Sequence, residues 1–477
     1  MKNEIEKKTK NGFYWMTAGK IIQGAVRIIV LTILARLIRP DEFGIVAAAM
    51  VVISFAEILS QIGLGQVLIK KRNLTEGDIS LAHLFSIATG ILFALLIIGT
   101  APLFSGIFGI KEMHSVLTVL SIVFPINGIA TVSESLIQRN LRFRIYSLII
   151  VSSYLGYAIC GIIFAGLGFG LWALVIATLA NATIKSGLLV FFQRHSWKLK
   201  LSRNGLKELV SQGTGFSIIK IFDYLSQQID NLIVGKWLGP AALGIYSRTF
   251  QLVATPTALI GQVFDKVLFP ALALVQGKNE MIKKTLYSGT TAISLVVPIS
   301  VLLTLLSEEF IEVLLGQRWT AAVVPFSILS IGIYFRLMAR FLVNMIKATG
   351  SVFNLAALQG INVVTIFLAS LIGVNWGING VSWGILISVI MNYLLLVIRG
   401  LKLIQADLKK FIISHRDGIM LALLKWLLLS LMIEYIEKIF DSPVIVIGIS
   451  TASTVLIYAI YVFFNKKKLY NEWVKSS

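Results

Sequence analysis

The sequence predicts an all-α integral membrane protein, on three observations. Apolar residues make up 57% of the 477 positions and charged residues only 14%, with a mean hydropathy of +0.85, which is not the composition of a soluble protein. Apolar stretches of about 17 to 25 residues, the length that crosses a bilayer, recur along the chain. Basic residues gather in alternate connections between these stretches.

We expect about fourteen transmembrane helices, because that many apolar stretches are long enough to span. The connections between them are too short to hold a folded domain. The expected helices lie near residues 12–37, 43–69, 81–103, 114–138, 146–167, 171–192, 212–236, 243–270, 286–307, 320–346, 353–374, 377–399, 418–436 and 443–464.

The placement of lysine and arginine predicts the topology. Of these 43 residues, 28 fall at the two termini and in the loops that follow every second helix, while the opposite loops hold six. This positive-inside pattern predicts that both termini are cytoplasmic. The formal charge of +20 is thereby explained by membrane topology, and we expect no nucleic-acid partner.

No pattern typical of soluble catalysis is present in the sequence. The single cysteine, Cys160, excludes an intramolecular disulfide and a cysteine-based metal cluster. The four histidines are scattered, and the sequence contains no zinc motif, P-loop, nucleophile elbow or dinucleotide fingerprint. We therefore expect no catalytic residue, no metal site and no cofactor.

An internal repeat divides the chain. A shift of 200 residues aligns Lys20 with Lys220, Pro40 with Pro240 and Gly44 with Gly244, and a weaker match aligns the stretch from Leu120 with that from Leu329. Six helices separate the copies, so the two repeats run in the same direction through the membrane. The prediction is an N-terminal lobe at 1–208, a C-terminal lobe at 209–405, and helices 13 and 14 with a tail at 406–477.

Polar stripes along apolar helices mark the expected site. A charge that faces acyl chains costs at least about 2.5–3.5 kcal/mol, so we expect these side chains to face a central cavity between the lobes. Their mainly positive charge favours an anionic cargo. The candidate cargo-binding residues are Lys20, Gln23, Arg27, Lys220, Gln227, Arg336 and Arg340.

Several of these residues have a second interpretation. Lys20 is close enough to the inner interface to extend its ammonium group into water. Asp223 and Asp230 fit either a structural ion pair or a coupling-ion site, and Glu57 fits either a counter-ion or a proton carrier.

The stretches "NGFYWMTAGKIIQGAVRIIVLTILARLIRPDEFGIVA" and "ILSQIGLGQVLIKKRNLTEGDIS", the segment "IQRNLRF" and helix 7 resemble the polysaccharide transporter family of lipid-linked oligosaccharide flippases. This family shares a superfamily with multidrug and toxic compound extruders and the lipid II flippase. The resemblance implies alternating access and transport of undecaprenyl-pyrophosphate-linked oligosaccharides, for O-antigen, capsule or exopolysaccharide. It also implies a bacterial cytoplasmic membrane and polysaccharide polymerase machinery as a partner. We expect a monomer in membrane lipid.

Two other functions stay open at this stage. An ion-coupled multidrug exporter of the same superfamily has the same two-lobe plan, but a cationic drug needs acidic sites, which the stripes do not favour. A membrane oligosaccharide polymerase or ligase typically acts through a large outer loop, whereas the longest outer connections here are about a dozen residues.

Overall fold

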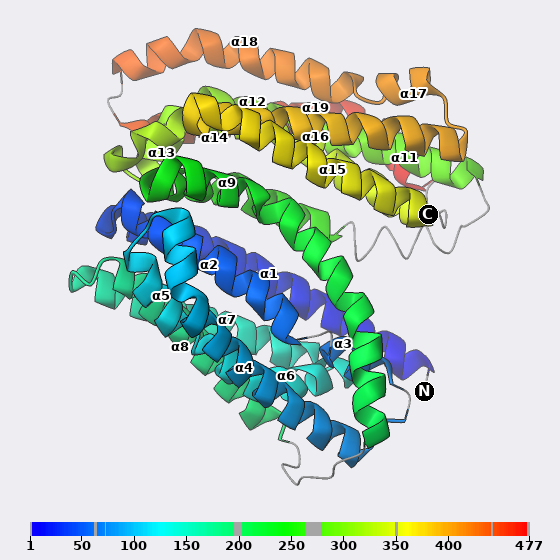
Figure 1. Cartoon of the computed structure of the whole chain (residues 1–477). Helices are drawn as coiled ribbons and strands as arrows, with labels where there is room; N and C mark the ends of the chain where they lie inside the picture. Colours follow the sequence, from blue (N-terminus) through cyan, green and yellow to red (C-terminus); the bar gives the residue numbers. More distant parts are fainter. Residues whose placement is uncertain are drawn as a thin grey trace. The chain divides into compact units, whose positions relative to one another are not determined.

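The computed structural model describes residues 2–61, 64–71, 73–194, 203–263, 279–348, 352–439 and 442–474. These residues form helices and contain no strand (Figure 1). Ten helical segments among them are long and apolar enough to cross a bilayer, with Ala357–Ile404 counted as one. The predicted all-α, multi-pass membrane fold is confirmed, while the total of fourteen spans stays a prediction.

The chain divides into two compact units, Met1–Ser247 and Arg248–Ser477. The first unit holds α1 (Lys2–Leu37), α2 (Pro40–Gln61), α3 (Leu64–Lys70), α4 (Glu76–Phe108), α5 (Glu112–Leu120), α6 (Val123–Arg139), α7 (Phe143–Gly166), α8 (Leu171–Phe192) and the first part of α9 (Arg203–Val263). The second unit holds the end of α9, then α11 (Asn279–Ser294), α12 (Val297–Leu305), α13 (Ser307–Leu314), η2 (Gln317–Ala322), α14 (Val323–Ala348), α15 (Val352–Gly373), η3 (Val374–Trp376), α16 (Gly377–Ile404), α17 (Leu408–Ile413), α18 (Arg416–Ile439) and α19 (Pro443–Val474).

Helix α9 is two helices joined at a break. Gly239 has φ 82° and ψ −178°, a conformation that residues with a Cβ rarely adopt. Pro240 follows and occupies the first turn of the second helix, where the missing N–H is not needed. The break therefore falls between the two spans that the sequence predicts at 212–236 and 243–270.

The two copies of the repeated proline–glycine pair touch each other within the first unit. A Cβ built on Gly44 of α2 would lie 1.7 Å from the carbonyl oxygen of Pro240, and a Cβ built on Gly244 would lie 1.8 Å from the carbonyl oxygen of Pro40. Two helix starts related by the repeat thus pack backbone against backbone. Further along, the Tyr224 hydroxyl donates to the carbonyl oxygen of Val51 on α2.

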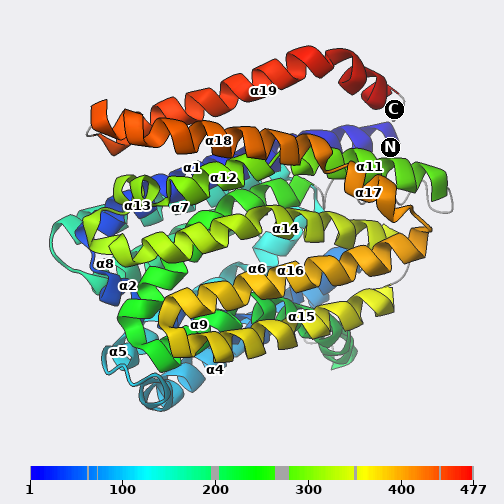
Figure 2. The same ribbon diagram turned by 90° about the horizontal axis from the view of Figure 1, so that it is seen from above.

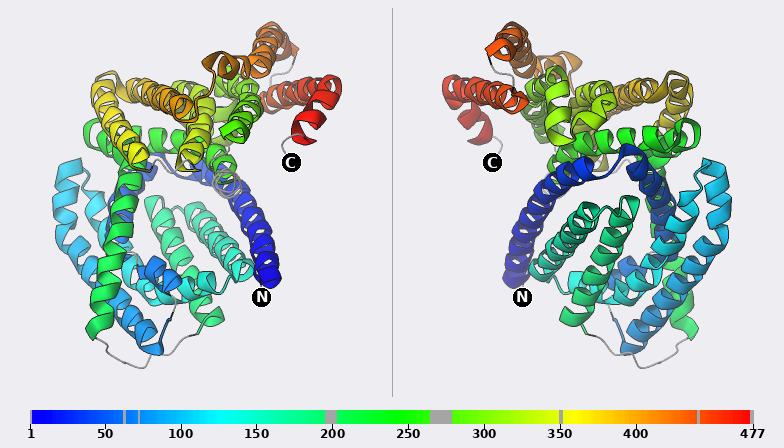
Figure 3. Two further views of the ribbon diagram at one scale, coloured as in Figure 1. Left: turned by 90° about the vertical axis from the view of Figure 1, so that its right-hand side faces the viewer. Right: turned by 90° about the vertical axis from the view of Figure 1, so that its left-hand side faces the viewer.

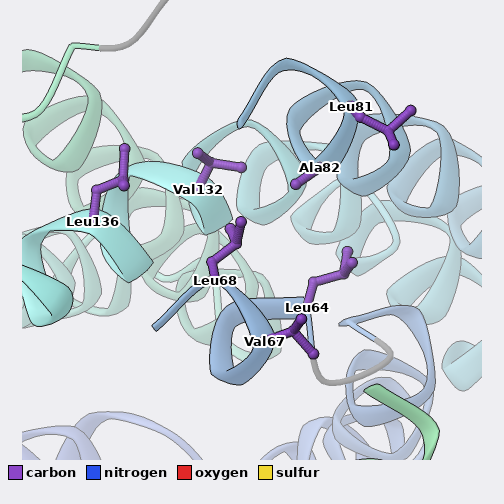
Figure 4. Close-up of a cluster of buried hydrophobic side chains, with 7 residues drawn as sticks. All are labelled: Leu64, Val67, Leu68, Leu81, Ala82, Val132 and Leu136. Carbon is purple, nitrogen blue, oxygen red and sulfur yellow. The ribbon is translucent and has the colours of Figure 1, made fainter. Parts of the chain in front are cut away.

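The connection from α2 to α4 is held by a short helix and a capping box. Thr75 caps α4, its hydroxyl accepting from the Asp78 N–H while the Asp78 carboxylate accepts from the Thr75 N–H. Lys71 adds an ion pair of 2.9 Å to Asp78. Below this cap α3, α4 and α6 share a buried cluster, Leu64, Val67, Leu68, Leu81, Ala82, Val132 and Leu136 (Figure 4).

The two arginines of the segment "IQRNLRF" donate hydrogen bonds to main-chain carbonyl groups at helix ends. Arg139 Nη1 donates to the carbonyl oxygens of Leu68, Ile69 and Lys71 at 2.7, 3.2 and 2.6 Å, which lack helical donors because α3 ends there. Arg142 Nη1 donates to the Phe192 carbonyl at 3.1 Å and to Gln193 Oε1 at 2.9 Å. The segment therefore ties the end of α6 to the ends of α3 and α8.

We expect Arg139→Gln to lower the free energy of unfolding by about 2 kcal/mol, because it leaves carbonyl groups without their charged donor. The measurement is the Tm of the detergent-purified protein. Arg399→Gln, at an exposed position of α16, is the control and should leave the Tm unchanged. An equal Tm for Arg139→Gln and the wild type would contradict the assigned role.

In the second unit, α15 and α16 pack side by side (Figure 3), and α19 lies beside α18 (Figure 2). Gly384 makes the first contact close, since a Cβ there would lie 2.5 Å from the carbonyl oxygen of Ala369. Lys425 of α18 is fully buried and donates to the Ser450 carbonyl at 2.7 Å and to Ser453 Oγ at 2.6 Å on α19. This lysine joins the last two helices.

Candidate functional site

Two arginines of α14 contact the end of α9 in the second unit, and a third arginine lies on α9 itself. Arg336 and Arg340 lie on α14 and Arg248 on α9, and all three side chains are half-buried. Measured from the start of α14 at Val323, Arg336 is about 20 Å and Arg340 about 26 Å along the helix, at 1.5 Å per residue. Arg336 and Arg340 therefore lie well inside the span.

Each guanidinium group has an identified neighbour. The Arg336 guanidinium carbon lies 4.7 Å from the centre of the Phe250 ring, a cation–π geometry. Arg248 Nη1 donates to Gln251 Oε1 at 2.7 Å. The Arg340 side chain passes directly over Gly261, where a built Cβ would lie 2.4 Å from Cδ and 2.7 Å from Nε.

This arrangement suits the binding of a phosphate or pyrophosphate group. A guanidinium group stays charged, and its planar N–H edge matches two phosphate oxygens. Cation–π packing uses the face of the group, whereas phosphate oxygens bind at its edge. We name Arg336 and Arg340, one turn apart on α14, the arginine cluster.

The polar stripe predicted on α1 consists of Lys20, Gln23 and Arg27. Lys20 and Gln23 are half-buried and Arg27 is exposed. Among the described residues, none accepts a hydrogen bond from Arg27 or forms an ion pair with it. The same helix packs on α7 nearby, where Ser147 Oγ donates to the Trp15 carbonyl at 2.8 Å and leaves no room for a Cβ on Gly19.

The repeated stripe on α9 falls partly outside the described structure. The side chains of Lys220 and Asp223 lie outside the described residues, and Gln227 is exposed. Asp230 is 3% exposed; its carboxylate accepts from the Tyr246 hydroxyl at 2.7 Å and from the Asn231 N–H at 2.9 Å. Since Asp230 and Tyr246 flank the break at Gly239, this bond fixes the two parts of α9 at their turn.

Glu57 of α2 is half-buried and hydrogen-bonded to amides. Its Oε1 accepts from Asn127 Nδ2 of α6 at 2.8 Å and from Gln61 Nε2 at 3.3 Å. An amide lowers the cost of a buried carboxylate without supplying a positive charge. These contacts are compatible with both predicted roles, counter-ion and proton carrier.

Other polar contacts of the first unit were not predicted. Glu134 of α6 pairs with Lys185 of α8 at 3.0 Å and accepts from the Tyr146 hydroxyl of α7 at 2.8 Å, which joins three helices. In both units, the sequence also did not predict which residues contact the site residues, namely Phe250, Gly261, Tyr246 and Asn127. A phenylalanine or glycine in an apolar helix carries no periodic signal that distinguishes it from its neighbours.

No candidate metal centre is found in the part of the chain that the structure describes, since no three histidine, cysteine, aspartate or glutamate side chains there are grouped for one.

Comparison with solved structures supports the fold. The structure titled "Lipid II flippase MurJ, inward closed conformation" superposes with a TM-score of 0.76, at 13% sequence identity, over 96% of this chain and 99% of that chain. Together with the ten apolar segments that are long enough to cross a bilayer, this fold defines a polytopic membrane protein.

Comparison of sequences then gives the family. The family model described as polysaccharide biosynthesis protein matches residues 33–324, and the chain belongs to that family. The teichuronic acid biosynthesis protein TuaB of Bacillus subtilis (strain 168) is 26% identical over 69% of this chain and 68% of its own length. The lipopolysaccharide biosynthesis protein WzxC of Escherichia coli (strain K12) is 20% identical over 67% of this chain and 65% of its own length.

Proposed function

We propose that the protein is a flippase for undecaprenyl-pyrophosphate-linked oligosaccharide repeat units. It moves them by alternating access from the inner to the outer leaflet of the bacterial cytoplasmic membrane, for O-antigen, capsule or exopolysaccharide assembly. The arginine cluster carries this proposal, because half-buried guanidinium groups inside a span suit a pyrophosphate that must cross the membrane. The family and the named biosynthetic roles of TuaB and WzxC support it.

The cargo has two parts with opposite needs. The pyrophosphate and its sugars cannot enter hydrocarbon, because unpaired charges and hydroxyl groups are prohibitively costly there. The prenyl tail has the opposite preference and stays in lipid. Lys20, Gln23, Arg27, Lys220, Gln227, Arg336 and Arg340 are the proposed cargo-binding residues, and the protein acts as a transporter without catalysis.

The multidrug exporter is the second candidate. A cationic drug needs carboxylates that are available to it, but Asp230 is buried and already accepts from Tyr246 and Asn231. Glu57 is a candidate for a coupling-ion site, since its carboxylate is half-buried and accepts from Asn127 and Gln61. The coupling roles of Glu57, Asp223 and Asp230 are part of this proposal, as are a monomeric state and a polymerase partner.

Deleting the gene in the source bacterium distinguishes these candidates. For a flippase we expect loss of surface polymer and accumulation of lipid-linked repeat units in the inner leaflet, measured by mass spectrometry of extracted lipids. The plasmid-borne wild-type gene should restore both. Unchanged surface polymer with increased sensitivity to cationic drugs would instead identify an exporter.

The proposed topology has both termini in the cytoplasm. We expect a tag inserted beside Arg203 to be inaccessible in intact cells and a tag inserted after Gly109 to be labelled from outside, because lysine and arginine favour the cytoplasmic side. Each tag is a single introduced cysteine in a protein whose Cys160 is replaced by alanine, and the measurement is its labelling by an impermeant maleimide. The opposite accessibility would reject the topology and the two-lobe division at 208 and 405 with it.

A further inference from the structure

We propose that Phe250 and Gly261 of α9 are positioning residues that hold Arg336 and Arg340 at two separate depths. The cargo then meets two successive anion stations, an Arg336 station and an Arg340 station. This inference rests on the proposed function for the identity of the cargo, but the stations themselves are argued from the geometry of α9 and α14.

On α14 alone the two arginines would lie together. Arg336 and Arg340 are one turn apart, which places them on the same face with Cα atoms about 6 Å apart along the axis. Two like charges at this spacing repel each other. Nothing in the sequence of α14 indicates that their guanidinium groups separate.

The contacts with α9 separate them. Arg336 lies over the Phe250 ring, and Arg340 passes over Gly261. Phe250 and Gly261 are eleven residues apart, which is close to three full turns, so they share one face of α9 at points about 16 Å apart. The two guanidinium groups are therefore held against points much further apart than their own Cα atoms.

Each contact has a distinct physical basis. Phe250 attracts the guanidinium face electrostatically, whereas phosphate oxygens bind at the N–H edge. Gly261 acts through the space it leaves, since a built Cβ would lie 2.8 Å from Arg340 Nη1. Glycine weakens a helix relative to alanine, and Gly261 does not have the positive φ that would require it. A larger residue at this position would displace the end of the Arg340 side chain.

Two stations of one guanidinium each suit transport better than one strong site. A binding site on a transport path must be favourable enough to receive the cargo and weak enough to release it. A pyrophosphate that leaves Arg340 can be received by Arg336 before it is fully hydrated. The positions of Phe250 and Gly261 then set the length of that step.

Titration of the detergent-purified full chain tests this inference. Isothermal titration calorimetry with inorganic pyrophosphate, and in parallel with farnesyl pyrophosphate, should give about two binding equivalents in the wild type. Gly261→Ala should lower the stoichiometry to about one, and Phe250→Leu should weaken one event at least fivefold. Phe250→Trp should retain both events, because tryptophan keeps the cation–π contact.

Matched controls are available in the same unit. A Cβ at Gly448 meets nothing within 4 Å, and Phe463 is 77% exposed, so Gly448→Ala and Phe463→Leu should both keep two events. Arg340→Gln removes the same station without changing α9, and it replaces Gly261→Ala if that variant is not recovered as a monodisperse protein.

The two stations would be overturned by a single binding event in the wild type that Gly261→Ala and Phe250→Leu weaken alike. They would also be overturned if Gly261→Ala and Arg340→Gln both kept two unchanged binding events. Binding of inorganic pyrophosphate without farnesyl pyrophosphate would separate the stations from a lipid cargo and overturn their role in its transport. If the gene deletion leaves surface polymer unchanged while the purified protein shows two binding events, the proposed function is rejected and the two stations are retained.

Discussion

Arg340→Ala is expected to lower export of the lipid-linked repeat unit by roughly 100-fold. Alanine removes the N–H edge that binds phosphate oxygens, and two charge-assisted hydrogen bonds lost together cost about 3 kcal/mol. Arg27→Ala should have a similar effect if Arg27 also binds the pyrophosphate. The measurement is surface polymer and inner-leaflet lipid-linked repeat units in cells that express each variant at matched membrane levels.

The conservative variants distinguish charge from geometry. Arg27→Lys and Arg340→Lys keep the charge but lose the planar fork, so partial export is expected. Lys402→Ala, at an exposed position on α16, is the control and should export normally. Normal polymer output from both alanine variants would show that these charges only serve the fold, and the cationic pathway would have to be abandoned.

Gly44→Ala is expected to destabilise the folded protein by about 3 kcal/mol or more, a large effect for one methyl group. The added carbon would lie 1.7 Å from the Pro240 carbonyl oxygen, which belongs to the backbone and cannot rotate away. Overpacking at such a site forces the two helix starts apart. The measurement is the Tm and the yield of monodisperse protein in detergent.

Gly99→Ala is the matched control, since Gly99 also lies inside a helix of the first unit and a Cβ there meets nothing within 4 Å. Alanine is the better helix former, so the Tm of this variant should equal or exceed that of the wild type. Gly244→Ala should reproduce the loss seen for Gly44→Ala. A wild-type Tm for Gly44→Ala would show that the close approach is not needed for stability.

The sequence was sufficient for the fold because periodic features determine it. Apolar stretches and their lengths predict the membrane helices, and the repeat that aligns Pro40 with Pro240 predicts equivalent helix starts. The repeat could not predict that these starts touch. Equivalent positions in two copies share a conformation, but contact depends on how the helices pack.

The sequence indicated the candidate site only where it is charged. Arg336 and Arg340 were recognised because a charge in an apolar helix is costly, whereas Phe250 and Gly261 belong to the 28 phenylalanines and 38 glycines of the chain and have no such cost. Arg139 was counted among the basic residues that set topology. Its contacts with carbonyl groups about 70 positions earlier in the chain depend on packing alone.

The reciprocal contact of Gly44 and Gly244 also limits how the two repeats can diverge. A substitution to a larger side chain is usually balanced by a smaller side chain at a neighbouring position, and the two positions then change together. Here each glycine faces a main-chain carbonyl, which no substitution can shorten, so a larger residue at one position cannot be compensated at the other. The two positions, 200 residues apart, therefore each require glycine independently of the other.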